Sequence, residues 1–146
     1  MEINLKPIGF VRNAVTESHR EDWQSVTSEI IVNEDLTEAL SGISGFSHII
    51  VIFWMHRISP QERSIKKVHP RKDRNLPLTG VFATRSPARP NPIGLATVKL
   101  VEQQGNILKV TGLDAVDGTP VLDIKPHIPG SDSPTATKIP GWLTKQ

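Results

Sequence analysis

The chain has 146 residues, with 17 Lys and Arg against 15 Asp and Glu, five His and no Cys. A chain of this length is typical of one domain that buries its core without disulfides or a structural metal. The lack of Cys excludes a disulfide framework, a Cys-ligated zinc or iron–sulfur site and a cysteine nucleophile.

The first 45 residues alternate between strand and loop patterns. Residues 3–11 alternate polar and apolar side chains, which predicts a first strand rather than a secretory signal, and residues 12–24 predict a long polar loop. Residues 28–32 predict a second strand. Asp35 and Glu38 fit a capping box, so residues 36–43 are predicted to form a short helix that ends at Gly42 and Gly45.

Residues 46–55 contain the longest apolar run of the chain, rich in β-branched and aromatic side chains. A run of this length predicts a strand that is buried on both faces and lies at the centre of the core. It is much shorter than the ~20 residues that cross a bilayer. We therefore expect a cytoplasmic protein without a membrane span.

Basic residues are concentrated between Arg57 and Arg89. Nine basic and two acidic residues give this segment a net charge of +7, and the rest of the chain carries −5. Such a segment suits a polyanionic partner, although a solvated loop rich in Lys and Arg fits the same pattern. The candidate contacts to a polyanion are Lys66, Lys67, Arg71 and Lys72.

The second half of the chain predicts short strands at residues 80–84, 93–102, 107–113 and 120–124, with turns at 104–106 and 117–118. Nine of the twelve prolines lie from Pro77 onward, which disfavours helix there. We therefore predict a mainly β protein, a single-domain β-barrel or pseudobarrel over residues 1–146 with one short helix. Residues 130–146 are predicted to form an extended tail in which Trp142 packs against the body.

The common nucleotide and hydrolase motifs are absent from the sequence, namely the Rossmann and P-loop glycine patterns, His-Glu-x-x-His and Gly-x-Ser-x-Gly. A metal could be held by histidines and aspartates together, but their spacing matches no metal motif, so no metal site is predicted. The residues considered for it are His48, His56, His69, Asp114 and Asp117.

Two long motifs carry most of the candidate chemistry. In GVFATRSPARPNPIGL, residues 80–95, three prolines flank Arg89 and Asn91, which suits a preorganised ligand contact and also fits a rigid surface turn. Arg85 follows an apolar stretch, where a guanidinium needs an anion or carbonyl groups as partner. In GLDAVDGTPVLDIKPH, residues 112–127, Asp114 and Asp117 bracket a turn that could direct carboxylates towards ribose hydroxyls or a cationic ligand, although Asp also simply favours turns.

Together the two motifs resemble the TsaA-like family, whose best understood members are tRNA methyltransferases of the TrmO type. The resemblance covers nearly the whole chain and includes Gly9 in the first strand, residues 45–48 before the apolar run and His56 after it. It implies a small β-barrel that binds S-adenosylmethionine without a Rossmann sheet, as a homodimer. It also implies methylation at N6 of threonylcarbamoyladenosine, the modified base at position 37 beside the anticodon of tRNA.

By position, the resemblance also implies the site. With tRNA as the expected polyanion, the charge of the basic segment makes Lys66, Lys67, Arg71 and Lys72 candidate contacts to RNA. His56 is the candidate general base by its residue type. The residues that match the cofactor-contacting segments or lie in the signature are His56, Arg57, Arg85, Arg89, Asn91, Asp114, Ala115, Val116 and Asp117.

The chain also departs from the pattern of the bacterial members. They carry Pro-Arg-Gln where this chain has residues 17–23, they have Gln where it has Arg57, and the longer ones have a C-terminal extension that it lacks. These departures bear on the methyl acceptor more than on the cofactor. The alternatives are a methyltransferase for another acceptor, or a non-catalytic module that binds S-adenosylmethionine or RNA.

Overall fold

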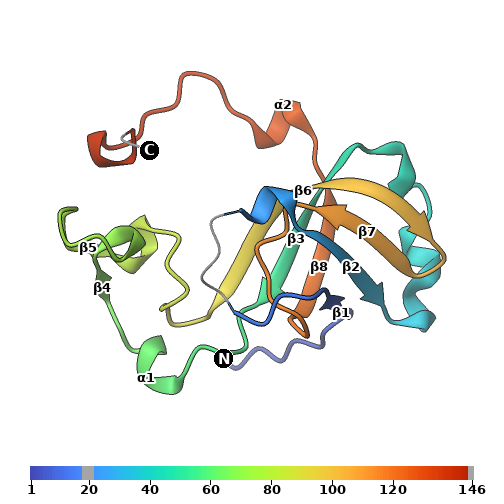
Figure 1. Cartoon of the computed structure of the whole chain (residues 1–146), viewed down its shortest axis with the longest axis horizontal. Helices are drawn as coiled ribbons and strands as arrows, with labels where there is room; N and C mark the ends of the chain where they lie inside the picture. Colours follow the sequence, from blue (N-terminus) through green and yellow to red (C-terminus); the bar gives the residue numbers. More distant parts are fainter. Residues whose placement is uncertain (18–21, 145–146) are drawn as a thin grey trace. The chain divides into compact units, whose positions relative to one another are not determined.

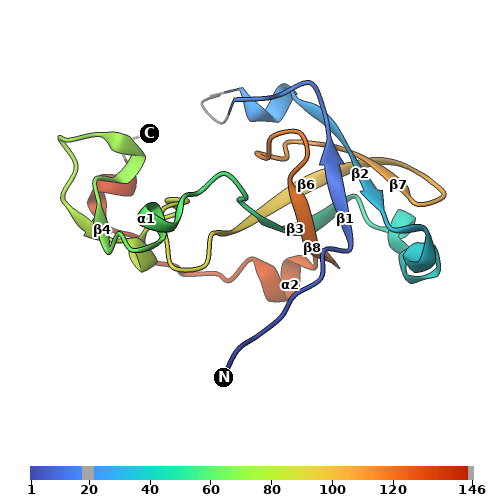
Figure 2. The ribbon, with the colours of Figure 1, turned by 90° about the horizontal axis from the view of Figure 1, so that it is seen from below.

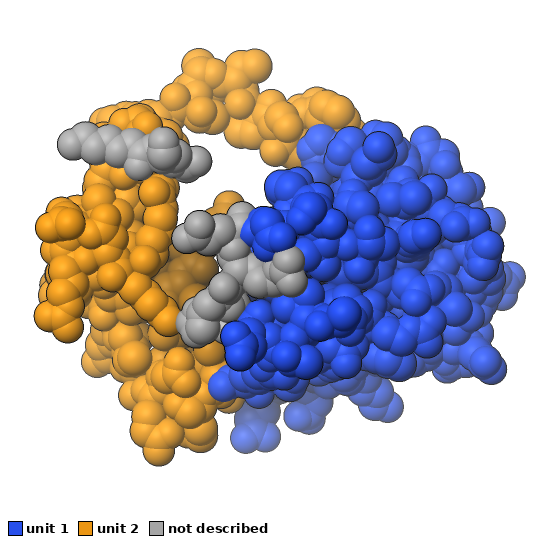
Figure 3. Space-filling view, in the orientation of Figure 1, with its two compact units in different colours: residues 1–57, 93–127 blue, residues 58–92, 128–146 orange. Residues whose placement is uncertain are grey.

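The structure is a computed structural model, which describes residues 1–17 and 22–144. The chain divides into two compact units (Figure 3). The first consists of residues 1–57 and 93–127, and the second of residues 58–92 and 128–146. Whether the whole chain acts as one domain stays a prediction.

A closed antiparallel β-barrel forms the first unit, as predicted (Figure 1). Around the barrel the order is β1-β2-β7-β6-β3-β8, so strands distant in the sequence become neighbours. The bounds are Gly9–Arg12 for β1, Thr27–Val32 for β2, His48–Trp54 for β3, Ile93–Gln104 for β6, Ile107–Thr111 for β7 and Pro120–Pro126 for β8. Gly105, with φ of 59°, forms the turn between β6 and β7 at the predicted place.

The core fills the interior of this barrel. Strand side chains alternate between the two faces of a sheet, so β3 directs Ile49, Val51 and Phe53 inward, where all three are buried. Its other side chains are half-buried or exposed, and the prediction that β3 is buried on both faces is wrong. Because Ile50, Ile52 and Trp54 on the outer face are apolar too, the sequence of this strand does not show the alternation that the barrel imposes.

The barrel closes where β1 meets β8. Two residue pairs join these strands, Gly9 with Val121 and Phe10 with Pro120, whereas seven join β3 to β6. Backbone hydrogen bonds continue the contact, from Ile8 N to Val121 O at 2.8 Å and from Val11 N to Thr119 O at 2.9 Å. Among the strand contacts of the barrel, this seam is therefore the shortest and joins segments more than a hundred residues apart.

Two predictions for the amino-terminal part are corrected. The strand expected over residues 3–11 is confined to Gly9–Arg12, and the preceding residues run away from the barrel (Figure 2). The helix expected over residues 36–43 is a 3-10 helix over Glu34–Leu40, without a side-chain hydrogen bond at its N-cap residue Asn33. Further 3-10 helices lie at Trp23–Ser25 and Ile43–Gly45.

Short elements make up the second unit. They are helix α1 (Pro60–Arg63), strands β4 (Lys67–Val68) and β5 (Thr79–Gly80), helix α2 (Pro129–Asp132), and 3-10 helices at Pro70–Lys72, Val81–Ala83 and Gly141–Leu143. The capping box of this chain lies at α1, where Ser59 Oγ accepts from Glu62 N and Glu62 Oε1 accepts from Ser59 N, both at 3.2 Å.

Two predictions fail in this unit. The strand predicted over residues 80–84 is wrong, because β5 ends at Gly80 and the next three residues form a 3-10 turn. The tail from residue 130 is not uniformly extended, since α2 and a 3-10 helix lie in it, and Trp142 is half-buried. Across residues 1–17 and 22–144, no helix has the length and apolarity to cross a membrane.

Candidate functional site

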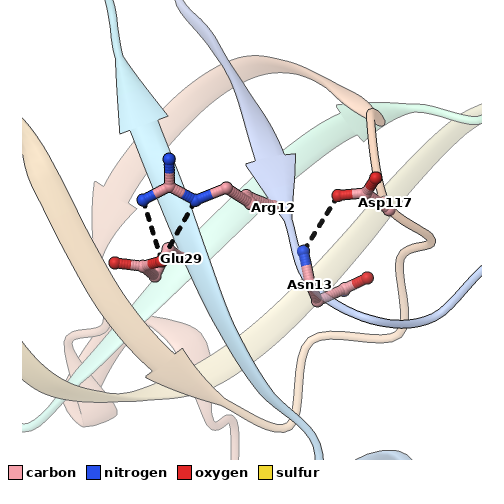
Figure 4. Close-up of polar contacts among 4 residues, drawn as sticks. All are labelled: Arg12, Asn13, Glu29 and Asp117. Atoms are coloured by element: carbon pink, nitrogen blue, oxygen red, sulfur yellow. Dashed lines mark hydrogen bonds and ion pairs between the residues drawn. The ribbon is translucent and has the colours of Figure 1, made fainter.

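The side chain of Asn13 makes three of the hydrogen bonds that hold the loop after β1. Its Nδ2 donates to Ser28 Oγ and to the carbonyl of Ala115, both at 2.9 Å, and its Oδ1 accepts from Val15 N at 2.9 Å. Its backbone N donates to Asp117 Oδ1 at 3.0 Å (Figure 4). One half-buried amide therefore fixes the loop against both β2 and the turn before β8.

That turn, residues 112–118, is the one predicted from the aspartates. Its ends contain Gly112 and Gly118, with φ of 91° and 82°, in the left-handed region that glycine adopts readily. Asp117 N donates to Val15 O at 2.7 Å, so the turn and the loop after β1 hold each other in both directions.

The side chains of the turn face two ways. Those of Ala115 and Val116 are buried, so these residues can offer a ligand little besides backbone groups. Asp114 and Asp117 are exposed at the surface of the first unit. The turn therefore presents two carboxylates on a backbone with little freedom to move.

Arg57 joins the same loop from the end of β3. Its Nη1 donates to the carbonyl of Thr16, three residues after Asn13. The loop over residues 13–16 is thus hydrogen-bonded both to Arg57 and to the turn with Asp114 and Asp117. Through this loop, the first unit links residues that the sequence predicted for the site. We call the loop over residues 13–16 with the turn over residues 112–118 the paired loops.

His56 precedes Arg57 at the end of β3. Partial burial of its ring, followed by the positive charge of Arg57, lowers the pKa of His56 below its usual value of 6.5. The imidazole is therefore neutral at pH 7 and has a nitrogen free of a proton. Because the folded chain binds this proton more weakly than the unfolded chain, the contribution of His56 to stability falls as the pH drops below 6.5.

We predict that Arg57→Gln raises the pKa of His56 part of the way back to 6.5, because the larger cause, burial, remains. A proton NMR titration of the His56 ring measures this. Arg12→Gln serves as the control, since Arg12 pairs with Glu29 at 2.9 Å and should leave the His56 titration unchanged. A complete return to 6.5 in Arg57→Gln would show that charge alone causes the shift.

The other predicted residues belong to the second unit. The guanidinium of Arg89 binds the chain's own carbonyls, with Nη1 donating to Ser86 O at 2.9 Å and Thr84 O at 3.2 Å, and Nη2 to Val81 O at 3.0 Å. The sequence analysis expected such carbonyl partners for Arg85, and the structure shows them for Arg89 instead. Arg85 itself is exposed. Direct contacts from Arg85 and Arg89 to a cofactor stay predictions.

Asn91 and the four candidate RNA contacts also lie in this unit. Asn91 Oδ1 accepts from Arg63 Nη2 at 3.5 Å, and Arg63 Nε donates to Pro90 O at 2.7 Å. These bonds join α1 to the proline-rich segment. The candidate RNA contacts Lys66, Lys67, Arg71 and Lys72 are all exposed.

Sequence reasoning missed Asn13, Thr16 and Ser28. Each lies in a polar stretch whose composition marks a loop or strand end, and two partners of Asn13, Ala115 and Asp117, follow about a hundred residues later. Of residues 17–23, where the chain departs from bacterial members, 18–21 lie outside the described residues. Within the described part of the chain, no group of three or more His, Asp or Glu side chains is placed to hold a metal ion.

Comparison with known proteins places this arrangement in a family. The family model described as the tRNA-methyltransferase O N-terminal domain matches residues 16–133. A probable S-adenosyl-L-methionine-binding protein of Methanothermobacter thermautotrophicus is 45% identical over 91% of this chain and 96% of its own length. A mouse tRNA (adenine(37)-N6)-methyltransferase is 40% identical over 87% of this chain, which covers 28% of the mouse protein.

Solved structures agree with this assignment. A crystal structure of TrmO has a TM-score of 0.77 and 32% sequence identity over 95% of this chain, which spans 64% of the TrmO chain. A TrmO from Pseudomonas aeruginosa has a TM-score of 0.75 and 30% identity over 94% of this chain, which spans 62% of it. The barrel, the two motifs and the extent of the match lead to one conclusion: the chain belongs to the family of the tRNA-methyltransferase O N-terminal domain, the TsaA-like family.

Proposed function

We propose that the chain is an S-adenosylmethionine-dependent tRNA N-methyltransferase that acts on N6 of threonylcarbamoyladenosine at position 37. The observation that carries the proposal is the paired loops, in which Asn13 fixes a turn with two exposed carboxylates and Arg57 donates to the Thr16 carbonyl of the neighbouring loop. The names of relatives support the cofactor and the nucleic acid, since one is a probable S-adenosyl-L-methionine-binding protein and another a tRNA (adenine(37)-N6)-methyltransferase.

The chemistry of the paired loops fits this cofactor. S-adenosylmethionine has ribose hydroxyls and an ammonium group that carboxylates bind, and a carboxylate that a guanidinium binds. We assign Asp114 and Asp117 to the ribose hydroxyls or the ammonium group, and Arg57 to the carboxylate of the cofactor. Ala115 and Val116 offer backbone groups to the adenine. Arg85, Arg89 and Asn91, in the second unit, stay predicted contacts to the cofactor.

Methyl transfer needs alignment more than covalent chemistry. When bound, the cofactor supplies a methyl group on a sulfonium for in-line displacement, and a rigid site provides the alignment. The hydrogen bonds of Asn13 and Arg57 give the paired loops that rigidity. His56 is neutral at pH 7, so its free nitrogen can take the proton that the acceptor nitrogen loses as it gains the methyl group.

The acceptor is tested directly with two forms of one tRNA. We predict that the protein methylates tRNA containing threonylcarbamoyladenosine once and leaves the same tRNA without that modification unchanged, as read by mass spectrometry of the nucleosides. Calorimetry with S-adenosylmethionine alone measures cofactor binding separately. Equal methylation of both tRNAs would mean another acceptor, and cofactor binding without transfer to either would favour a binding module.

RNA contact is assigned to the exposed cations of the second unit. Each phosphate contact contributes ~0.7 to 0.9 to the slope of log affinity against log salt. Replacing Lys66, Lys67, Arg71 and Lys72 together by alanine should therefore reduce that slope by about three and leave cofactor binding intact. The double variant Lys99→Ala/Lys109→Ala, on exposed barrel positions, is the control and should keep the slope. An unchanged slope in the quadruple variant would make the basic segment a solvated surface.

We also infer a homodimer. On the outer face of the barrel, Leu95 lies opposite Ile52 and Ile93 opposite Trp54, and Leu95 and Ile93 remain 50% and 40% exposed. A contiguous apolar surface of this kind favours association between copies. Sedimentation equilibrium measures it, and a mass of one chain at all concentrations would contradict it. A tRNA substrate is consistent with the cytoplasmic location expected from the sequence.

A further inference from the structure

The second unit contains a groove of about 570 Å³ with an apolar lining. It is bordered by the start of the proline-rich motif and by the segment after α1. Its lining includes Arg63, Ile65, Lys66, Val81, Phe82 and Pro90. The proposed function uses one residue of its lining, Lys66, as an RNA contact and assigns no role to its apolar surface.

Phe82 is the unusual residue of the groove, because this aromatic residue is 81% exposed. An aromatic ring in water contributes nothing to a core, so its exposure calls for another explanation. The backbone around it is held firmly: Arg89 donates to the carbonyls of Val81 and Thr84 on either side, and Thr84 Oγ1 donates to Val81 O at 2.9 Å. The turn therefore holds the backbone that carries the ring, which lowers the entropy cost of binding something against it.

Charge indicates what kind of molecule binds there. Arg63 and Lys66 line the groove, and residues 58–92 contain eight Lys and Arg against two Asp and Glu, a net charge of +6. A second copy of the chain would bring the same positive segment to the contact, which opposes association through this face. A nucleotide instead combines a flat apolar base with a negative phosphate, and so matches both the ring and the cations.

We propose that this groove binds an unstacked base of single-stranded RNA, with Phe82 as the stacking surface and Arg63 and Lys66 beside the adjoining phosphates. The inference rests on the proposed function, because the anticodon loop of a tRNA offers such bases to a protein. Stacking of this kind tolerates any base, so the groove would add affinity for the loop without reading its sequence.

The test compares Phe82→Ala, Phe82→Trp and Leu78→Ala in binding to an anticodon stem-loop RNA, measured by fluorescence anisotropy. Loss of a stacked base should weaken binding of Phe82→Ala by about 5- to 150-fold. Phe82→Trp should bind at least as tightly as the wild type. Leu78 is 56% exposed and does not line the groove, so Leu78→Ala should bind normally. The salt dependence should stay the same in all three, because no charge changes.

A second RNA isolates the base itself. When the loop nucleotides are abasic, Phe82→Ala and the wild type should bind equally, so the coupling between ring and base disappears. Equal affinity of Phe82→Ala and the wild type for the intact loop would overturn the inference. So would a fall in sedimentation mass of Phe82→Ala without a change in RNA affinity, which would make the groove a contact between copies.

Failure of the proposed function gives a different pattern. A wild-type protein that binds the loop through Phe82 but methylates no tRNA would contradict the methyltransferase and leave the groove as an RNA site. A wild-type protein that binds no stem-loop RNA would contradict both.

Discussion

Asn13→Ala is expected to weaken S-adenosylmethionine binding by ten-fold or more and to lower the free energy of unfolding by about 2 kcal/mol. The variant removes the three side-chain hydrogen bonds of Asn13 and leaves the Ala115 carbonyl and the Val15 amide without those partners. The paired loops then lose their main cross-connection, so the carboxylates of the turn are no longer held in place. Isothermal titration calorimetry, at a temperature well below the melting of the variant, measures the affinity.

Asn33→Ala is the matched control for this variant. Asn33 also lies in the first unit and donates one side-chain hydrogen bond, from Nδ2 to Pro7 O at 3.2 Å, away from the paired loops. Its replacement should leave cofactor affinity unchanged. If Asn13→Ala were less stable but bound the cofactor as tightly as the wild type, the paired loops would not form the cofactor site.

The largest effect on stability is expected from Gly9→Ala, which should lower the free energy of unfolding by about 3 kcal/mol or more. A Cβ at this position would lie 2.2 Å from Ile31 O and 2.9 Å from Val32 Cα. Both atoms belong to the backbone of β2, so no side-chain rotation relieves the collision, and β1 must separate from its partner. Urea denaturation measures the loss, which is a large part of the roughly 5–15 kcal/mol typical of a domain.

Gly45→Ala provides the comparison at a glycine with open space around it. Beyond its chain neighbours, no atom lies within 4 Å of the position that an added methyl group would take, and its φ is outside the left-handed region. The substitution should change the unfolding free energy by less than about 1 kcal/mol. Gly9→Ala with a similarly small effect would show that β1 and β2 can move apart at little cost.

Local sequence was sufficient for four of the six barrel strands and insufficient for the elements between them. β2, β6, β7 and β8 are short runs rich in β-branched and other apolar side chains, with glycine turns after β6 and before β8, and both signals act over a few residues. The residues Val81–Ala83 are as apolar as a strand, but the structure exposes Phe82 instead of pairing it. Likewise Asp35 and Glu38 match a capping box that the structure does not form, while Ser59 and Glu62 form one within a segment read as a basic stretch.

The candidate site also contains residues that local sequence predicts and residues that it does not. The turn with Asp114 and Asp117 was predictable, because Asp-Gly pairs favour turns wherever they occur. The role of Asn13 was not, because its partner Asp117 is 104 positions away and only the closed barrel brings them together. An asparagine in a polar stretch carries no local signal that distinguishes a structural link from a solvated side chain. Arg89 shows the converse, since its motif suggested a ligand and its guanidinium binds carbonyls.

The seam between β1 and β8 has a consequence for the order of folding. Contacts between distant segments form late, because a long loop must close before they bring any gain. The loop after β1 and the turn before β8 continue directly from the two sides of this seam, so the surface with Asp114 and Asp117 is assembled when the barrel closes. A ligand that contacts both sides of the seam would stabilise the closed barrel against local opening of β1 from β8. Hydrogen exchange of the Val11 and Gly118 amides should therefore slow most when it binds.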